Sequence, residues 1–147
     1  MKIALSLIAM ALAGLLLWRP APAVGPEPIR YGRDACDHCR MHFAGKGFAA
    51  ERRDETGALR KYDDIGCMLV AASHGASRDA WIEDHATGNF VPLLNATFVR
   101  GGDVSTPMNS GIVGFANAIE AAAFARAHGA RVVALEGLLR GTEEDRR

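Results

Sequence analysis

Residues 63–72 read DDIGCMLVAA, and this stretch decides the fold of the first half of the chain. The apolar run from Ile65 to Ala72 has helical character. Asp63 or Asp64 precedes it, and either carboxylate can accept a hydrogen bond from a free amide of the first turn. Gly75 is a suitable stop, because glycine readily adopts the conformation that ends a helix. The segment therefore predicts a short helix capped by an aspartate.

Two short runs precede this helix, at residues 47–53 and 58–62. They flank Asp54-Glu55-Thr56-Gly57, an acidic turn that ends in glycine. Such a turn between two short runs is typical of a β-hairpin. The order of the first half is therefore strand, strand, helix.

A similar order appears further along the chain. Residues 80–83 and 95–100 are candidate strands, separated by a loop that contains Gly88 and Pro92. A long polar and glycine-rich loop then occupies residues 101–111. The two candidate strands predict the start of a second half that resembles the first.

The second half continues with an alanine-rich segment from Ala118 to His128. Asn117 and Glu120 have the spacing of a capping box, and Gly129 is placed to close the helix. Alanine is the strongest helix former, so we expect a regular helix here. Residues 131–135 predict a last strand.

These elements predict an α+β fold, built from two related strand-strand-helix halves packed as one small domain. With 147 residues, a single domain is the expected number. The predicted organisation has four parts: a signal peptide or signal anchor at 1–23, a proline- and glycine-containing tether at 24–33, a metal-binding domain at 34–140, and a charged, frayed tail at 141–147.

The first 23 residues have the pattern of a secretory signal. Lys2 is followed by an apolar run from Ile3 to Trp18, and Ala21-Pro22-Ala23 resembles a cleavage site. As a helix the run is about 24 Å long, shorter than a bilayer core of about 30 Å, so an uncleaved membrane anchor is the second choice. We expect the protein to be exported to the periplasm, either free or attached to the inner membrane through this segment.

Charge excludes one class of partner. Without residues 1–23 the chain carries 15 Lys and Arg against 17 Asp and Glu. It has no dense basic tract with interleaved aromatic residues, so we expect no binding to nucleic acid.

Residues 34–42, DACDHCRMH, concentrate metal donors. Cys36, Cys39 and Met41 offer two thiols and a thioether, a combination that suits the soft ion Cu(I). His38 and His42 flank the second cysteine, and either can supply a nitrogen donor or remain a solvated loop histidine. The interpretation favoured here is a Cu(I) site on a loop that can rearrange as ligands are exchanged.

A second methionine fits the same site. Met108 comes directly after Pro107 in a loop of small and polar residues, where no apolar periodicity accounts for it. If this loop folds over the cysteines, Met108 completes a sulfur site. Long loops without structure of their own are often functional.

Two other interpretations of the cysteines stay open. Cys36, Cys39, Cys67 and His74 match a structural zinc set, although Cys67 on an apolar helix is more readily a core residue. Asp63 and Asp64 are better explained as helix caps than as metal ligands, because carboxylates are poor partners for Cu(I).

The other interpretation is an exported thiol-disulfide oxidoreductase that uses Cys36 and Cys39. That motif usually starts a helix after a strand, whereas here a tether precedes it and Gly45 and Gly47 interrupt the segment after it. The sequence contains no metalloprotease or phosphate-binding motif. We expect a protein that is not an enzyme.

Four segments resemble the NosL-type copper chaperones, accessory proteins of nitrous-oxide reductase maturation. Cys36–Met41 resembles their C-x-x-C-x-M signature, and Tyr62–Met68 resembles the aromatic-acidic segment that opens their first helix. Thr106–Met108 resembles their Pro-Met loop, and His128-Gly129 before Val132-Val133 resembles their closing helix and strand.

The resemblance implies a bacterial envelope protein with an α+β fold of two related halves. It further implies that the protein binds Cu(I) and delivers it to a periplasmic cuproenzyme, with nitrous-oxide reductase as the expected recipient. Carried over by position, the implied ligands are Cys39, Met41 and Met108, with Cys36 beside them.

Overall fold

The computed structural model describes residues 25–72 and 79–144, the side chains of 142–144 excepted. Residues 1–23, the predicted helix stop Gly75 and His74 of the zinc set lie outside the described residues. The elements, in chain order, are β1 (Ala50–Arg53), β2 (Leu59–Tyr62), α2 (Ile65–Ala71), β3 (Ala80–Glu83), β4 (Phe90–Pro92), the 3₁₀ helix η1 (Leu93–Asn95), β5 (Thr97–Arg100), β6 (Ile112–Phe115), α3 (Ala118–Ala127), β7 (Arg131–Val133) and α4 (Leu135–Glu144).

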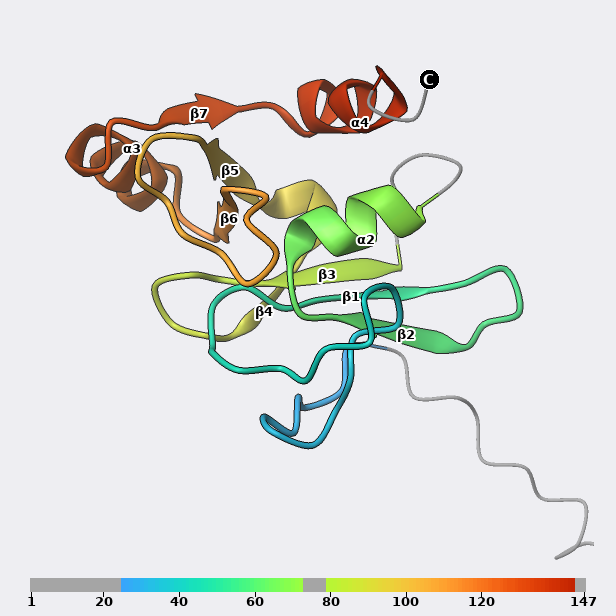
Figure 1. Cartoon of the computed structure of the whole chain (residues 1–147). Helices are drawn as coiled ribbons and strands as arrows, with labels where there is room; N and C mark the ends of the chain where they lie inside the picture. Colours follow the sequence, from blue (N-terminus) through green and yellow to red (C-terminus); the bar gives the residue numbers. More distant parts are fainter. Residues whose placement is uncertain (1–24, 73–78, 145–147) are drawn as a thin grey trace, which may run out of the picture.

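The strands form two antiparallel sheets, with orders β2-β1-β3-β4 and β6-β5-β7. In each sheet a hairpin leads into a helix, and the next strand returns beside the first strand of the hairpin. Figure 1 shows α2 over the first sheet and α3 beside the second. The predicted α+β fold of two related halves is confirmed.

The boundary between the halves differs from the prediction. Strand β3 pairs with β1 and with β4 in the first sheet, so the second half begins at β5 and not at residue 80. Strand β5 pairs with β7 and with β6, and the four residues of β6 were not predicted as a strand. Pairing between distant strands is set by tertiary packing, which local sequence patterns do not report.

Both principal helices begin at the predicted caps. Asp64 has an extended backbone, and its Oδ1 accepts from the Gly66 amide at 2.6 Å. The side chain of Asn117 accepts from the Ile119 amide at 2.8 Å. The helix α3 ends at Ala127, and Gly129 has φ +58°, as expected of a residue that closes a helix.

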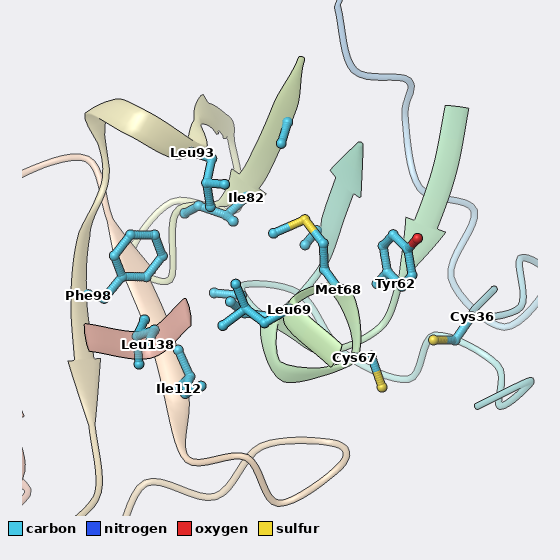
Figure 2. Packing of buried hydrophobic residues seen from close by; sticks show 13 residues of the cluster. Cys36, Tyr62, Cys67, Met68, Leu69, Ile82, Leu93, Phe98, Ile112 and Leu138 are labelled. Atoms are coloured by element: carbon cyan, nitrogen blue, oxygen red, sulfur yellow. The ribbon is translucent and has the colours of Figure 1, made fainter. Parts of the chain in front are cut away.

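One apolar cluster joins the two halves into a single unit. Figure 2 shows Ile82 from the first sheet near Phe98 from the second, with Leu69 of α2 nearby. The sheets approach closely at Gly114, where an added Cβ would lie 2.5 Å from Cδ1 of Ile82. A substitution that adds a side chain at Gly114 would therefore force the sheets apart.

The end of the chain also departs from the prediction. Residues 141–144 of the predicted tail belong to α4, residues 145–147 lie outside the described residues, and the last strand stops at Val133. Helix α4 contacts α2, and its Leu138 is buried in the shared apolar cluster. This tertiary contact stabilises a helix whose Gly137 and Gly141 weaken it locally. In the described part of the chain, none of the helices has the length and apolar character needed to span a membrane.

Candidate metal centre

The cysteine loop is closed by its own backbone. The Cys36 amide donates to the Met41 carbonyl at 2.8 Å, and the Arg40 amide donates to the Cys36 carbonyl at 3.0 Å. Ala35 and His42 form an isolated antiparallel bridge at the base. Arg40 adopts φ +68°, a left-handed conformation that reverses the chain between the second cysteine and Met41. Backbone hydrogen bonds therefore fix the spacing of the sulfur donors.

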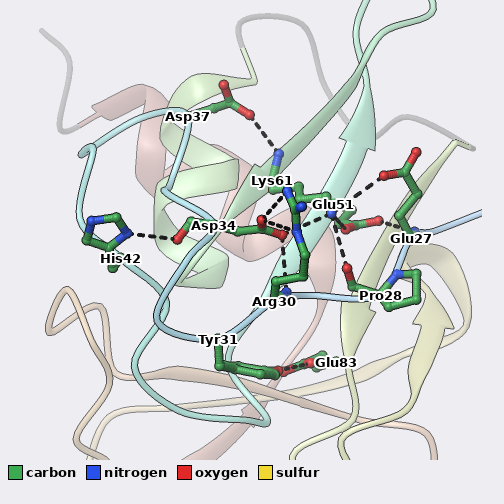
Figure 3. A network of polar contacts seen from close by, with 10 residues as sticks. All are labelled: Glu27, Pro28, Arg30, Tyr31, Asp34, Asp37, His42, Glu51, Lys61 and Glu83. Atoms are coloured by element: carbon green, nitrogen blue, oxygen red, sulfur yellow. Dashed lines mark hydrogen bonds and ion pairs between the residues drawn. The ribbon is translucent and has the colours of Figure 1, made fainter.

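Strand β2 holds this loop in place. The Asp37 amide donates to the Lys61 carbonyl at 2.8 Å, and the Lys61 amide donates to Oδ2 of Asp37 at 2.8 Å. The Lys61 ammonium also lies 3.2 Å from the carboxylate of Asp34, in a network that includes Glu27 and Glu51 (Figure 3). Because Lys61 is only two residues before Asp63, these contacts bring the loop to the start of α2.

Four donors meet at this junction. One ligand atom each from Cys36, Cys39, Asp63 and Cys67 lies within 4.8 Å of all the others. All three cysteines are free thiols, and Sγ of Cys39 lies 3.5 Å from Oδ1 of Asp63. Cys36 and Cys67 are buried, Cys39 is half-buried, and Figure 2 shows the Cys36 side chain pointing toward Cys67. The described part of the chain therefore presents a compact set of sulfur and oxygen donors.

The thiols have different acidities. A hydrogen bond from the Cys67 thiol, together with the backbone amides of Cys39 and Asp63, lowers the pKa of Cys36 to about 4. The same hydrogen bond and burial raise the pKa of Cys67, and burial raises the pKa of Cys39. Burial and the neighbouring Cys36 raise the pKa of Asp63 to about 6. The lowered pKa of Cys36 favours the thiolate, the form of cysteine that binds a metal ion, at the buried end of the cluster.

The loop that carries Met108 is tied to the same helix start. Asp64 is fully buried, and its Oδ2 accepts from the Thr106 hydroxyl at 2.7 Å and from the Met108 amide at 3.0 Å. Its Oδ1 accepts from the Ser110 hydroxyl at 2.6 Å. Gly66 permits this approach, because a Cβ there would lie 2.5 Å from Cβ of Ser110. One carboxylate thus caps α2 and positions Met108.

A pocket of about 380 Å³ lies between this loop and the cysteine cluster. Its lining includes Cys67 from α2, Met108 from the second half and His38 from the cysteine loop. The side chain of Met108 is 39% exposed and that of Met41 is 54% exposed. The structure therefore places the predicted ligand Met108 at a pocket that one of the clustered thiols also lines.

The two predicted histidines differ in their surroundings. His38 lines the pocket that Cys67 and Met108 share. His42 is turned toward the polar network, where its Nδ1 lies 3.4 Å from the carbonyl oxygen of Asp34 (Figure 3). Neither belongs to the four-donor cluster.

Two members of the cluster had another expected role. Cys67 does lie in the apolar core, as expected, and its thiol also belongs to the donor cluster. Asp63 was one of two candidate helix caps, and the cap is Asp64. Cys67 and Asp63 both lie within three positions of the N-cap Asp64, so the helix start itself was the available signal. Three members of the expected zinc set, Cys36, Cys39 and Cys67, do come together, and Asp63 stands beside them.

The fold and this cluster define a small α+β domain with a set of thiols that can hold a metal ion. The NosL family profile matches residues 31–140, and the chain belongs to the NosL family. In structure it is similar to the copper chaperone NosL from Shewanella denitrificans, with a TM-score of 0.65 and 17% sequence identity. That match covers 78% of this chain and 96% of the other, and at this identity it shows the fold alone. No functionally curated protein matches the chain.

Proposed function

We propose that this protein is a copper chaperone that binds Cu(I) and delivers it to a periplasmic cuproenzyme, with nitrous-oxide reductase as the recipient. The observation that carries the proposal is the meeting of three free thiols, one of which, that of Cys67, lines a pocket that Met108 also lines. Sulfur donors of both kinds, thiolate and thioether, favour a soft monovalent ion. Membership of the NosL family supports the same function.

In this proposal the paired thiols of Cys36 and Cys39 hold the ion, and the thioethers of Met41 and Met108 complete its coordination. The thiols and the thioethers differ in exposure to solvent, and this difference indicates from which side a partner protein can reach the ion. Cys36 is buried, whereas both methionines reach solvent, so an incoming protein can replace the methionines while the thiolates still hold the ion. His38 is the better placed nitrogen donor, since His42 would first have to leave the Asp34 carbonyl.

Zinc is the competing cargo, because Asp63 stands among the thiols. Three cysteines and a carboxylate are an acceptable tetrahedral set for Zn²⁺, while Cu(I) gains little from carboxylate oxygen. As a structural zinc domain, the purified protein would contain stoichiometric zinc and would unfold on chelation. A copper chaperone would instead stay folded without metal, and its Asp63→Ala variant would retain Cu(I) affinity.

The thiol-disulfide oxidoreductase hypothesis finds no support in the site geometry. Attack on a partner disulfide needs an accessible thiolate. Here the cysteine with the lowered pKa, Cys36, is fully buried, and the more accessible Cys39 has a raised pKa. We therefore propose a binding and transfer function without catalysis.

Export belongs to the same proposal. Residues 1–23 would direct the domain to the periplasm and, if uncleaved, hold it at the inner membrane. Cell fractionation of the full chain and of a variant that lacks residues 2–18 tests this. Recovery of the full chain from the cytoplasm would contradict export.

The experiment that tests copper binding is a titration of the reduced protein with Cu(I) against a competing chelator. We expect one ion per chain, and weaker binding in Cys36→Ser and Cys39→Ser. Transfer is then measured by mixing the loaded protein with metal-free nitrous-oxide reductase and determining the copper content of the reductase. Wild-type affinity in both serine variants would remove these thiols from the site.

A further inference from the structure

A second pocket, of about 310 Å³, adjoins the cysteine loop. Three loop residues, Asp37, His38 and Arg40, form part of its lining, and Arg52 and Arg60 from the β1-β2 hairpin form another part. His38 also lines the pocket that contains Met108. An occupant of the second pocket would therefore lie next to the metal loop.

The charges of this pocket do not balance. Its lining has three guanidinium groups and two carboxylates, those of Asp37 and Asp54. Arg60 uses both carboxylates, since its Nε lies 2.7 Å from Oδ2 of Asp54 and its Nη1 lies 3.7 Å from Oδ1 of Asp37. The positive charge in excess is therefore carried by Arg40 and Arg52.

Arg40 and Arg52 have more hydrogen-bond donors than they have acceptors in the described part of the chain. Nε of Arg52 is buried and has no acceptor among the described residues. Arg40 is exposed, and in the described part of the chain its guanidinium forms no ion pair. Its backbone has φ +68°, where an arginine is strained and glycine would not be. The chain thus keeps a cationic side chain at a position whose backbone favours glycine.

We propose that Arg40 and Arg52, with Arg60 beside them, form a binding site for carboxylate groups from an acidic segment of a protein that docks over the metal loop. Guanidinium groups bind carboxylates through two parallel hydrogen bonds, which fix orientation as well as charge. Docking here would hold a partner beside Met41 and Met108. This role rests on the proposed copper transfer, whereas carboxylate binding itself does not require a metal.

The test uses the full chain without metal and a hexaglutamate peptide as the probe. Peptide is added at low ionic strength, where surface charges are weakly screened, while NMR monitors the Arg52 Nε–H and the Arg40 amide. We expect saturable shifts at both positions, and Arg40→Gln should weaken binding by about fivefold, the effect of one exposed ion pair. Arg40→Lys should restore only part of the affinity, because an ammonium lacks the planar fork.

The matched control is Arg126→Gln, which removes an exposed arginine from α3. It should leave peptide affinity unchanged. An equal loss in both glutamine variants, or shifts spread over all surface arginines, would overturn the site. Citrate serves as a second probe, and binding of citrate without binding of the peptide would overturn the assignment to a protein partner. Because no copper is present, failure here leaves the proposed copper site to its own test.

Discussion

In the first unit the chain runs β1, β2 and α2 and returns as β3 beside β1; in the second it runs β5, β6 and α3 and returns as β7 beside β5. Equivalent positions can be matched from these registers. Tyr62 and Phe115 are the buried last residues of the second strands, and Asp64 and Asn117 are the helix caps two residues later. The two units therefore have the same chain path and the same position for the helix cap.

The units differ in what surrounds their helix starts. Asp64 is buried and accepts three hydrogen bonds from the 106–110 loop besides its capping bond, whereas Asn117 is exposed and caps its helix. The residues of the second unit at the positions equivalent to Asp63 and Cys67 are Ala116 and the exposed Glu120. The first unit therefore holds the thiols, while the second contributes a loop that reaches the same helix start.

Removing a thiol should have the largest effect. We expect Cys36→Ser to weaken Cu(I) binding on the order of a thousandfold, about 4 kcal/mol, because a soft thiolate is replaced by a hard hydroxyl. Glu120→Ser, in the second unit, should leave affinity unchanged. Competition with a Cu(I) chelator measures both, and a comparable loss in the two variants would contradict the distinction between the units.

The two caps give the next comparison. Asp64→Ala should cost about 3 kcal/mol of unfolding free energy, since it removes a buried acceptor of several hydrogen bonds. Asn117→Ala should cost about 1 kcal/mol, the value of an ordinary cap. Urea denaturation measures both. Equal losses would mean that the bonds to the 106–110 loop contribute no stability.

A buried acid provides a pH comparison. Burial raises the pKa of Glu51 to about 7, whereas the equivalent second residue of β5 is the buried Phe98. The Glu51 carboxyl then binds a proton more tightly in the folded state than in the unfolded state. Its contribution to the free energy of unfolding is therefore complete below about pH 4.5 and is lost as the pH rises to about 7. Glu51→Gln should reduce this loss by on the order of 2 kcal/mol. Urea denaturation at several pH values measures the free energy of unfolding of both proteins. The same pH dependence in Glu51→Gln as in the wild type would contradict the prediction.

Substitutions at two methionines should distinguish an effect on Cu(I) binding from an effect on core packing. Met108→Ala should weaken Cu(I) binding about tenfold, about 1.4 kcal/mol, with little change in stability because the side chain is 39% exposed. Met68→Ala should do the reverse, since Met68 is buried in the core and its loss creates a cavity. Chelator competition and thermal unfolding of both variants show whether the two effects separate.

The smallest effect is expected at Arg40. Replacement by glycine should stabilise the fold by about 0.5 kcal/mol, because glycine adopts φ +68° without strain but loses more chain entropy on folding. Urea denaturation measures the change. A destabilised Arg40→Gly variant would show that the arginine side chain contributes more to folding than its backbone costs.

Local features of the fold could be predicted from the sequence, and features that depend on distant contacts could not. The caps at Asp64 and Asn117 act within one turn of chain, so the starts of α2 and α3 were correct. The pairing of β3 and the helix around Leu138 depend on contacts with other elements. Strand β3 was assigned to the wrong half, and the helix was not predicted.

The same division holds for the candidate site. Cys36 and Cys39 lie on one short loop and were recognisable as a pair. Cys67 and Asp63 join them only because Lys61 and Asp37 fasten that loop to β2, just before α2 begins. Met108 was proposed as a ligand because no packing pattern accounts for it, and the Asp64 carboxylate holds its backbone near the start of α2.

The most direct test of a copper site shared by the two units is selenium X-ray absorption on Cu(I)-loaded protein grown with selenomethionine. Because copper is proposed to bind thiolates and thioethers together, selenium should show a copper neighbour. Met41→Ala and Met108→Ala should each reduce that signal, and the double variant should abolish it. A protein that binds one Cu(I) through sulfur while selenium shows no copper neighbour would contradict a site built from the cysteine loop and the loop of the second unit.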